Sequence, residues 1–113
     1  MIIILSKLAT KEDIDKALEH YQDFIKVTID IKKEMVAIGG EYHYDAEQKL
    51  LAMGSKQDHI WGGGLKISTK TIRTNAMINL RAQRNSSMEI LDLKVREKFI
   101  EVLKKYLNDF TEK

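Results

Sequence analysis

The hydrophobic and polar positions in the first part of the chain predict a strand, a helix and a hairpin. Residues 1–6 are β-branched and apolar on both faces, which is typical of an interior strand. Thr10 precedes acidic residues, and apolar positions then recur at helical spacing over residues 14–21, so a capped helix is expected. Residues 24–31 alternate with period two, and residues 35–38 are the expected hairpin partner.

The middle of the chain predicts a second helix and a second pair of strands. Asp45 begins an Asp-x-x-Gln pattern that resembles a capping box, and Gly54 supplies a left-handed stop for the helix. Residues 55–64 have the composition of a loop and end in three glycines. Residues 65–68 and 72–83 are expected to be strands, because the second segment alternates apolar and polar side chains.

The last helix has the clearest pattern. Asp92 is the expected cap, and an unbroken apolar stripe follows over residues 95–110. Trp61, the only tryptophan, is expected to anchor the core. The predicted order is β-α-β-β-α-β-β-α in one domain, residues 1–113. This order predicts an α+β fold, with one mixed or mostly antiparallel sheet and helices mainly on one face.

Composition excludes several classes of chemistry. The 113 residues include no cysteine and no proline. Disulfide frameworks, thiolate nucleophiles, cysteine-based zinc sites and iron–sulfur clusters are therefore excluded, and no cofactor is indicated. The apolar run at the N-terminus is too short to span a membrane and lacks the features of a signal peptide. We therefore expect a cytoplasmic protein without a membrane partner.

The small net charge of +2 hides an uneven distribution. Residues 1–56 have a net charge of −2 and residues 57–113 a net charge of +4. From His59 to Met88 the chain contains no acidic residue. The basic residues of this stretch are Lys66, Lys70, Arg73, Arg81 and Arg84.

This basic stretch predicts an anion-binding rim. Asn79 and Arg81 lie on one face of the expected strand 72–83, and Arg84 and Asn85 follow in a polar loop. Arginine and amide donors at a strand end suit phosphate, so a phosphorylated ligand or a nucleic-acid backbone is the expected partner. Lys66 and Arg73 are further candidates. The alternative is a solvated sheet face, with the loop forming an ordinary turn.

A second candidate site joins carboxylates to a histidine. If the chain is extended here, Glu41 and His43 share a face and Asp45 follows at the turn. One imidazole with two carboxylates suits a divalent metal that activates water, although no metal motif supports the site. The simpler interpretation is that Asp45 caps a helix and that His43 makes a local hydrogen bond.

Three segments carry a resemblance to a known family. They are Gly39-Gly40-Glu41 with His43, Asp45 and Glu47, then Gly54-Ser55-Lys56-Gln57 with Trp61-Gly62, then Ile78-Asn79-Leu80-Arg81 with Arg84-Asn85-Ser86. With these segments the chain resembles a small prokaryotic family of single-domain proteins of unknown function. The resemblance implies no activity. It implies shared polar positions at Glu41, His43, Gln57, Asn79, Arg81 and Asn85.

Three functional hypotheses follow from the residues. The first is a binding module for a phosphorylated ligand or a nucleic-acid backbone at the arginine–asparagine rim. The second is a structural or interaction protein that forms a homodimer through its open sheet face. The third is a metal-dependent hydrolase that uses Glu41, His43 and Asp45. The sequence favours the first, then the second, and no signature identifies an enzyme.

Overall fold

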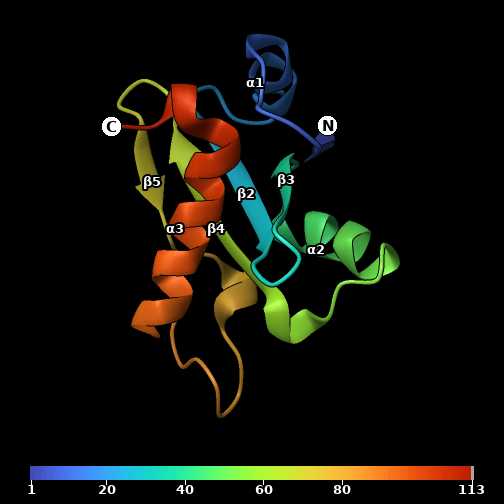
Figure 1. Cartoon of the computed structure of the whole chain (residues 1–113), viewed down its shortest axis with the longest axis vertical. Coiled ribbons are helices and arrows are strands. Elements are labelled where there is room, and N and C mark those ends of the chain that lie inside the picture. Colours follow the sequence, from blue (N-terminus) through green and yellow to red (C-terminus); the bar gives the residue numbers. More distant parts are fainter. Residues whose placement is uncertain (113) are drawn as a thin grey trace.

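A single antiparallel sheet organises the protein in its computed structural model, which describes residues 1–112 (Figure 1). The strand order is β1-β3-β2-β4-β5. The strands are β1 (Ile2–Leu5), β2 (Phe24–Asp30), β3 (Met35–Gly39), β4 (Ile60–Lys66) and β5 (Thr71–Arg73). The helices are α1 (Lys11–Ala17), α2 (His43–Ala52) and α3 (Leu93–Leu107), with short 3₁₀ helices η1 (Gln57–His59), η2 (Met77–Asn79) and η3 (Asn108–Phe110). The predicted order of strands and α-helices and the α+β class are confirmed.

The sheet is a middle layer with helices on both faces. Successive side chains of β2 point to opposite faces of the sheet. Ile25, Val27 and Ile29 point to the face that forms the main hydrophobic core with residues of α1 and α3. We call this the core face. The opposite face carries Lys26 and Thr28, and α2 lies against it. The helices α1 and α3 therefore lie on the core face, in line with the prediction of helices mainly on one face. We call the opposite face, part of which α2 covers, the second face.

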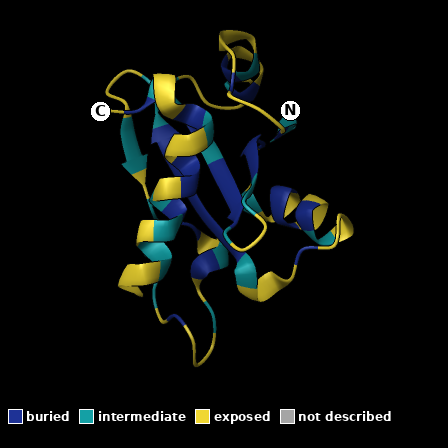
Figure 2. Ribbon diagram, viewed as in Figure 1, coloured by how far each residue is buried: buried dark blue, intermediate teal, exposed yellow. Residues whose placement is uncertain are grey.

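The core face provides most of the apolar packing. Phe99, Val102 and Leu103 of α3 are fully buried, and Figure 2 shows the buried side of this helix turned to the sheet. Trp61 is 2% exposed and belongs to the same cluster, as expected. The predicted cap of α3 is also confirmed, because the Asp92 carboxylate accepts hydrogen bonds from the amides of Lys94 and Val95 at 2.9 and 3.1 Å. None of the helices in residues 1–112 has the length and apolar character needed to cross a bilayer.

The prediction that the first strand lies in the interior of the sheet was wrong. β1 pairs only with β3 and is therefore an edge strand. Both of its faces are nevertheless apolar for local reasons. Leu5 belongs to the core cluster, and the side chain of Ile2 lies against Gly40. An edge strand that is covered on both faces has the same sequence pattern as an interior strand.

The predicted starts of α2 and β4 were also wrong. The helix begins at His43, two residues before Asp45, and Tyr42 occupies the cap position without a side-chain cap. Gly54, with φ of +97°, follows its end as predicted. The segment 55–64 is not a loop throughout, because β4 begins at Ile60 and includes the three glycines. Glycine lacks the side chain that usually signals a strand, which is why these residues resemble a loop.

The expected long strand 72–83 is mostly absent. β5 ends at Arg73, and the chain leaves the sheet to form η2. Beyond this point residues 74–76 bond to residues 88–90, since Ala76 N donates to Met88 O and Ile90 N donates to Thr74 O. Asn79 and Arg81 are consequently not neighbours on a sheet face. They belong to a folded segment that packs over the beginning of β4.

Candidate functional site

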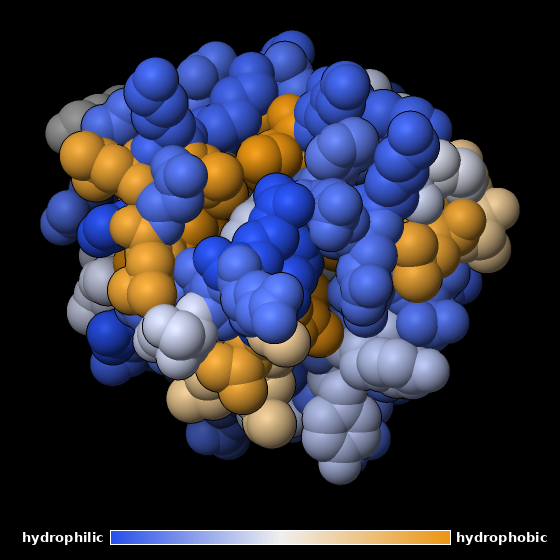
Figure 3. Space-filling model, turned by 90° about the horizontal axis from the view of Figure 1, so that it is seen from below, coloured by the Kyte–Doolittle hydropathy of each residue, from blue (hydrophilic) through white to orange (hydrophobic). Residues whose placement is uncertain are grey.

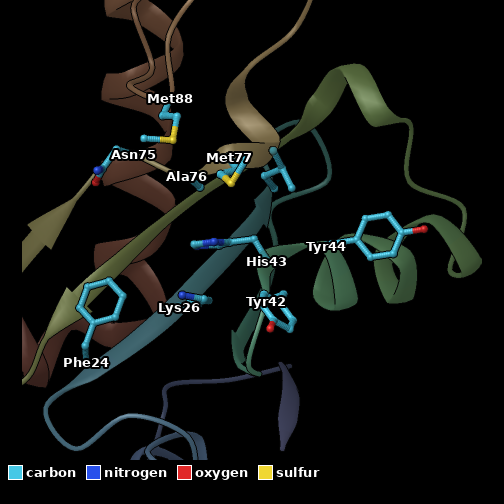
Figure 4. A pocket seen from close by; sticks show the side chains of 10 residues that line it. Phe24, Lys26, Tyr42, His43, Tyr44, Asn75, Ala76, Met77 and Met88 are labelled. Atoms are coloured by element: carbon cyan, nitrogen blue, oxygen red, sulfur yellow. The ribbon is translucent and has the colours of Figure 1, made fainter.

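The second face carries a pocket that neither charge nor motif analysis predicts. It has a volume of about 620 Å³ and lies between the start of α2, the strands β2 and β4, and the segment that contains η2 (Figure 4). This is the size range of a small-molecule site. Its lining residues are Phe24, Lys26, Tyr42, His43, Tyr44, Asn75, Ala76, Met77, Ile78 and Met88.

Two of the three glycines of β4, Gly62 and Gly64, explain how the pocket walls approach the sheet so closely, whereas Gly63 faces Phe99 on the core face. A Cβ atom at Gly62 would lie 2.7 Å from the Cβ of Ala76 and 3.0 Å from Cδ2 of His43. At Gly64 it would collide with the ring of Phe24. Because Gly62 and Gly64 have no side chains, His43, Ala76 and Phe24 pack directly against the backbone of β4.

His43 is a neutral histidine in the wall of the pocket. As the first residue of α2 it reaches β4, where its Nε2 lies 2.6 Å from the carbonyl oxygen of Gly63. Burial lowers the pKa of His43 from 6.5 to about 4, and the hydrogen bond to Gly63 offsets only part of this effect. At neutral pH the ring is therefore uncharged. Nε2 carries the proton and donates it to Gly63, and Nδ1 keeps its lone pair.

Lys26 places a positive charge in the same pocket. Its Nζ lies 4.6 Å from the ring centroid of Tyr21 and 5.9 Å from that of Phe24. The Tyr21 ring is fixed by its hydroxyl group, which donates to the carbonyl of Glu41 at 2.8 Å. Burial lowers the pKa of Lys26, and no acidic residue of the described chain counters this shift. The ammonium therefore faces the pocket beside two aromatic rings and, among residues 1–112, without an acidic partner.

The mouth of the pocket is apolar and open to solvent. Tyr42 and Tyr44 are each 59% exposed, and Met77 is 74% exposed. Met88 completes this rim. Figure 3, which views the end of the molecule, shows apolar patches between hydrophilic side chains. Exposed aromatic and methionine side chains around a concave site are typical of ligand-binding surfaces.

The three candidate metal ligands are not brought together. Glu41 and Asp45 line a separate depression of about 410 Å³ near the N-terminus, whereas His43 lines the main pocket. The reason is the early start of α2, because a helix turns His43 and Asp45 to different sides. Within residues 1–112, no three histidine or carboxylate side chains are grouped so that they would hold a metal ion.

Asn79 and Asn85 are buried and bind the backbone. The Asn79 amide accepts from the Gly62 amide at 2.8 Å and donates to the carbonyls of Gly62 and Met88 at 2.9 and 3.0 Å. The Asn85 amide donates to the carbonyls of Asn79, Ser87 and Glu89 and accepts from Leu91 N. Both side chains therefore use their hydrogen-bonding capacity to fix the chain between η2 and α3.

The two arginines pack around Trp61. The guanidinium of Arg81 lies 4.2 Å from the tryptophan ring centroid and donates to the carbonyls of Ile60 and Ile78. Burial lowers the pKa of Arg81, the nearby Arg84 lowers it further, and Glu47 and Asp58 oppose these effects. Arg84 forms an ion pair of 3.5 Å with Asp58 and is partly exposed.

The basic residues of the acid-free stretch do not form one patch. Arg81 and Arg84 lie near the start of β4, while Lys66 and Arg73 belong to the other end of the β4–β5 pair. A strand of this length separates its ends by roughly 20 Å. The segments around His43 and Asn79 do meet, because both side chains contact Gly62 from different directions.

Glu47 is a buried acid behind this region. It is 4% exposed, and burial raises the pKa of its carboxyl group, which Arg81 and Gln57 partly offset. From the sequence, Glu47 was included only in the family resemblance and was assigned no role, and Lys26 was missed. Lys26 has the pattern of a solvated strand position, and only the cover of α2 and η2 makes it part of a pocket.

Comparison with known proteins identifies a family but no activity. The family model described as "Protein of unknown function (DUF5674)" matches residues 3–106. No curated protein and no solved structure matches the chain.

Proposed function

The chain belongs to this family of unknown function, and we propose that it is a binding protein for small amphipathic anions. The ligand has an apolar or aromatic body and one acidic group, and it occupies the second-face pocket. The observation that carries the proposal is the Lys26 ammonium, which lies in an otherwise largely apolar pocket without an acidic partner in residues 1–112.

The apolar body of the ligand fits the rim. Met77, Met88 and Tyr42 provide polarisable surfaces that pack against a flat or flexible apolar group. The acidic group is placed at the inner end, beside Lys26. The first turn of α2 adds to the attraction, because the uncapped amides of a helix start favour an anion.

This proposal keeps the expected anion but changes the residues that bind it. Lys26 replaces the arginines as the main positive charge. Asn79 and Asn85 hold the pocket wall in place, and Arg81 packs on Trp61. Arg84 is not among the residues that line the pocket, and its ion pair with Asp58 already compensates its charge.

The test compares three ligands that share one aromatic body: naphthoate, naphthyl phosphate and the neutral naphthamide. Isothermal titration calorimetry should show that the two anions bind more tightly than the amide. Lys26→Met should weaken naphthoate binding by about tenfold, which corresponds to about 1.4 kcal/mol. The matched control Lys66→Met, on the neighbouring strand, should leave binding unchanged.

Chemical-shift mapping locates the ligand. Shifts confined to β2, the start of α2 and η2 support the proposal. Equal affinity for naphthoate and naphthamide, or shifts centred on Arg84, would contradict it. The ratio of naphthoate to naphthyl phosphate affinity distinguishes a carboxylate site from a phosphate site.

A further inference from the structure

The pKa of the Lys26 amine is shifted in the opposite direction from that of Lys98 and Lys105. Lys98 and Lys105 both donate to the carboxylate of Glu34, each at 3.1 Å, and this raises the pKa of both lysines. Lys26 has no such partner among residues 1–112, and burial lowers the pKa of its amine. Its free-amine fraction near neutral pH is therefore larger.

The surroundings of Lys26 contain the groups that amine chemistry requires. Lys26 and His43 both line the pocket, and Figure 4 shows their side chains extending in the same direction. The neutral ring of His43 keeps a lone pair on Nδ1 because its Nε2 is engaged with Gly63. With a pKa of about 4 the ring is a weak base, and its part in the proposal is to accept a hydrogen bond from the amine through Nδ1 and so orient the nitrogen.

We propose that Lys26 captures carbonyl compounds, aldehydes in particular, as a protonated Schiff base in this pocket. The inference rests on the proposed function in one respect, because both require the pocket to admit a small molecule. The substrate class is an apolar or aromatic aldehyde, whose body lies against Met77 and Met88.

The bond changes are those of imine formation. The neutral Nζ attacks the carbonyl carbon, so that the C–N bond forms as the C=O π bond breaks. A proton passes from the nitrogen to the oxygen through solvent water to give a carbinolamine. The hydroxyl group then takes a proton from the solvent and leaves as water, while the nitrogen lone pair forms the C=N bond, so that the imine nitrogen keeps one hydrogen and carries the positive charge. No oxidant or reductant takes part.

The aromatic rings near Lys26 favour the product. The protonated imine keeps the positive charge at the position of Nζ, where the rings of Tyr21 and Phe24 interact with a cation. The apolar aldehyde body meanwhile replaces water at the mouth of the pocket. The site thus stabilises both ends of the adduct.

The test is reductive trapping with naphthaldehyde and cyanoborohydride at neutral pH, followed by peptide mapping of every lysine. In the unmodified sequence Lys26 should be labelled several-fold faster than Lys66, which lies opposite Phe24 on β4. Lys26→Arg should abolish the fast component, because arginine retains the charge but is not a nucleophile. His43→Gln should slow labelling at position 26 and leave the rate at Lys66 unchanged.

The outcomes separate the two proposals. Labelling of Lys26 no faster than that of Lys66, with naphthoate still bound in the pocket, overturns the Schiff-base inference and leaves the proposed function intact. Fast labelling of Lys26 without a preference for naphthoate over naphthamide supports the inference and contradicts the proposed function.

Discussion

A single histidine shows how a pocket wall can make stability depend on pH. His43 touches the backbone of β4 and is largely enclosed by its neighbours, so its charged form is disfavoured in the folded protein. In the unfolded chain the same side chain is solvated and binds a proton more readily. The pocket is therefore intact while His43 is neutral, and protonation favours the unfolded state.

The prediction at this scale is a loss of stability on acidification. With a folded pKa of about 4 against 6.5, the unfolded state binds more protons between these two values. The contribution of His43 is complete above pH 6.5 and falls as the pH drops towards 4. At about 1.36 kcal/mol per pKa unit it amounts to no more than about 3 kcal/mol.

Urea denaturation at a series of pH values measures this contribution. His43→Gln should flatten the fall in the free energy of unfolding between pH 6.5 and pH 4.5. His20→Gln, at an exposed histidine, is the matched control and should retain the slope of the unmodified protein. Identical slopes for His43→Gln and the unmodified protein would show that His43 is not protonated on unfolding.

At the scale of elements, one side chain attaches η2 to the sheet. Beyond Arg73 no strand continues β5, and the amide of Asn79 bonds to both backbone groups of Gly62 as a neighbouring strand would. Its third bond, to Met88, ties in the returning chain. The wall of the pocket formed by Ala76, Met77 and Ile78 is therefore held by Asn79.

Replacement of this side chain should loosen the wall. Asn79→Ala leaves buried backbone groups of Gly62 and Met88 without partners, and we expect a loss of about 2–4 kcal/mol in the free energy of unfolding. Naphthoate binding should also weaken although Lys26 is unchanged. The exposed Asn75 provides the control, since Asn75→Ala should have little effect on stability. Similar urea midpoints for the two variants would refute this role of Asn79.

Elements were predictable from the sequence to the extent that their patterns are local. The helix caps at Thr10 and Asp92 and the alternation of β2 depend on near neighbours, and the structure confirms them. The position of β1 in the sheet and the path after Arg73 depend on tertiary contacts. The amide of Asn79 replaces a strand there, and a sequence does not distinguish it from a polar strand residue.

The candidate site was less predictable than the fold for the same reason. The positive charge of Arg81 and Arg84 led to the prediction of an anion-binding rim. In the structure these side chains instead contact backbone carbonyls, Trp61 and Asp58. The sequence does not identify Lys26 as a site residue, because a lysine in an alternating strand is typical of a solvent-exposed sheet face. Lys26 lines a pocket because α2 and η2, which are distant from it in the sequence, cover this part of the sheet.

For the whole molecule, the two faces of the sheet differ in their packing, and the proposed ligand site lies on the less densely packed face. The core face is covered by α1 and α3 and holds the continuous hydrophobic cluster. The second face combines α2, the pocket and a buried acid, Glu47, so its packing is thinner and more polar. The strands β2 and β4 are common to both layers, and they share the longest pairing register in the sheet.

The shared strands predict that both layers unfold together. Trp61 reports on β4 because it is the only tryptophan and is fully enclosed in the core, while far-ultraviolet circular dichroism reports on all three helices. Loss of the β2–β4 pair removes the support of α2 and α3 at once, because β2 contacts both helices, so the fluorescence and dichroism transitions in urea should coincide. If dichroism changes before Trp61 fluorescence, α2 unfolds separately from the core face. Added naphthoate should then move only that first transition, whereas for a single cooperative unit it moves both transitions by the same amount.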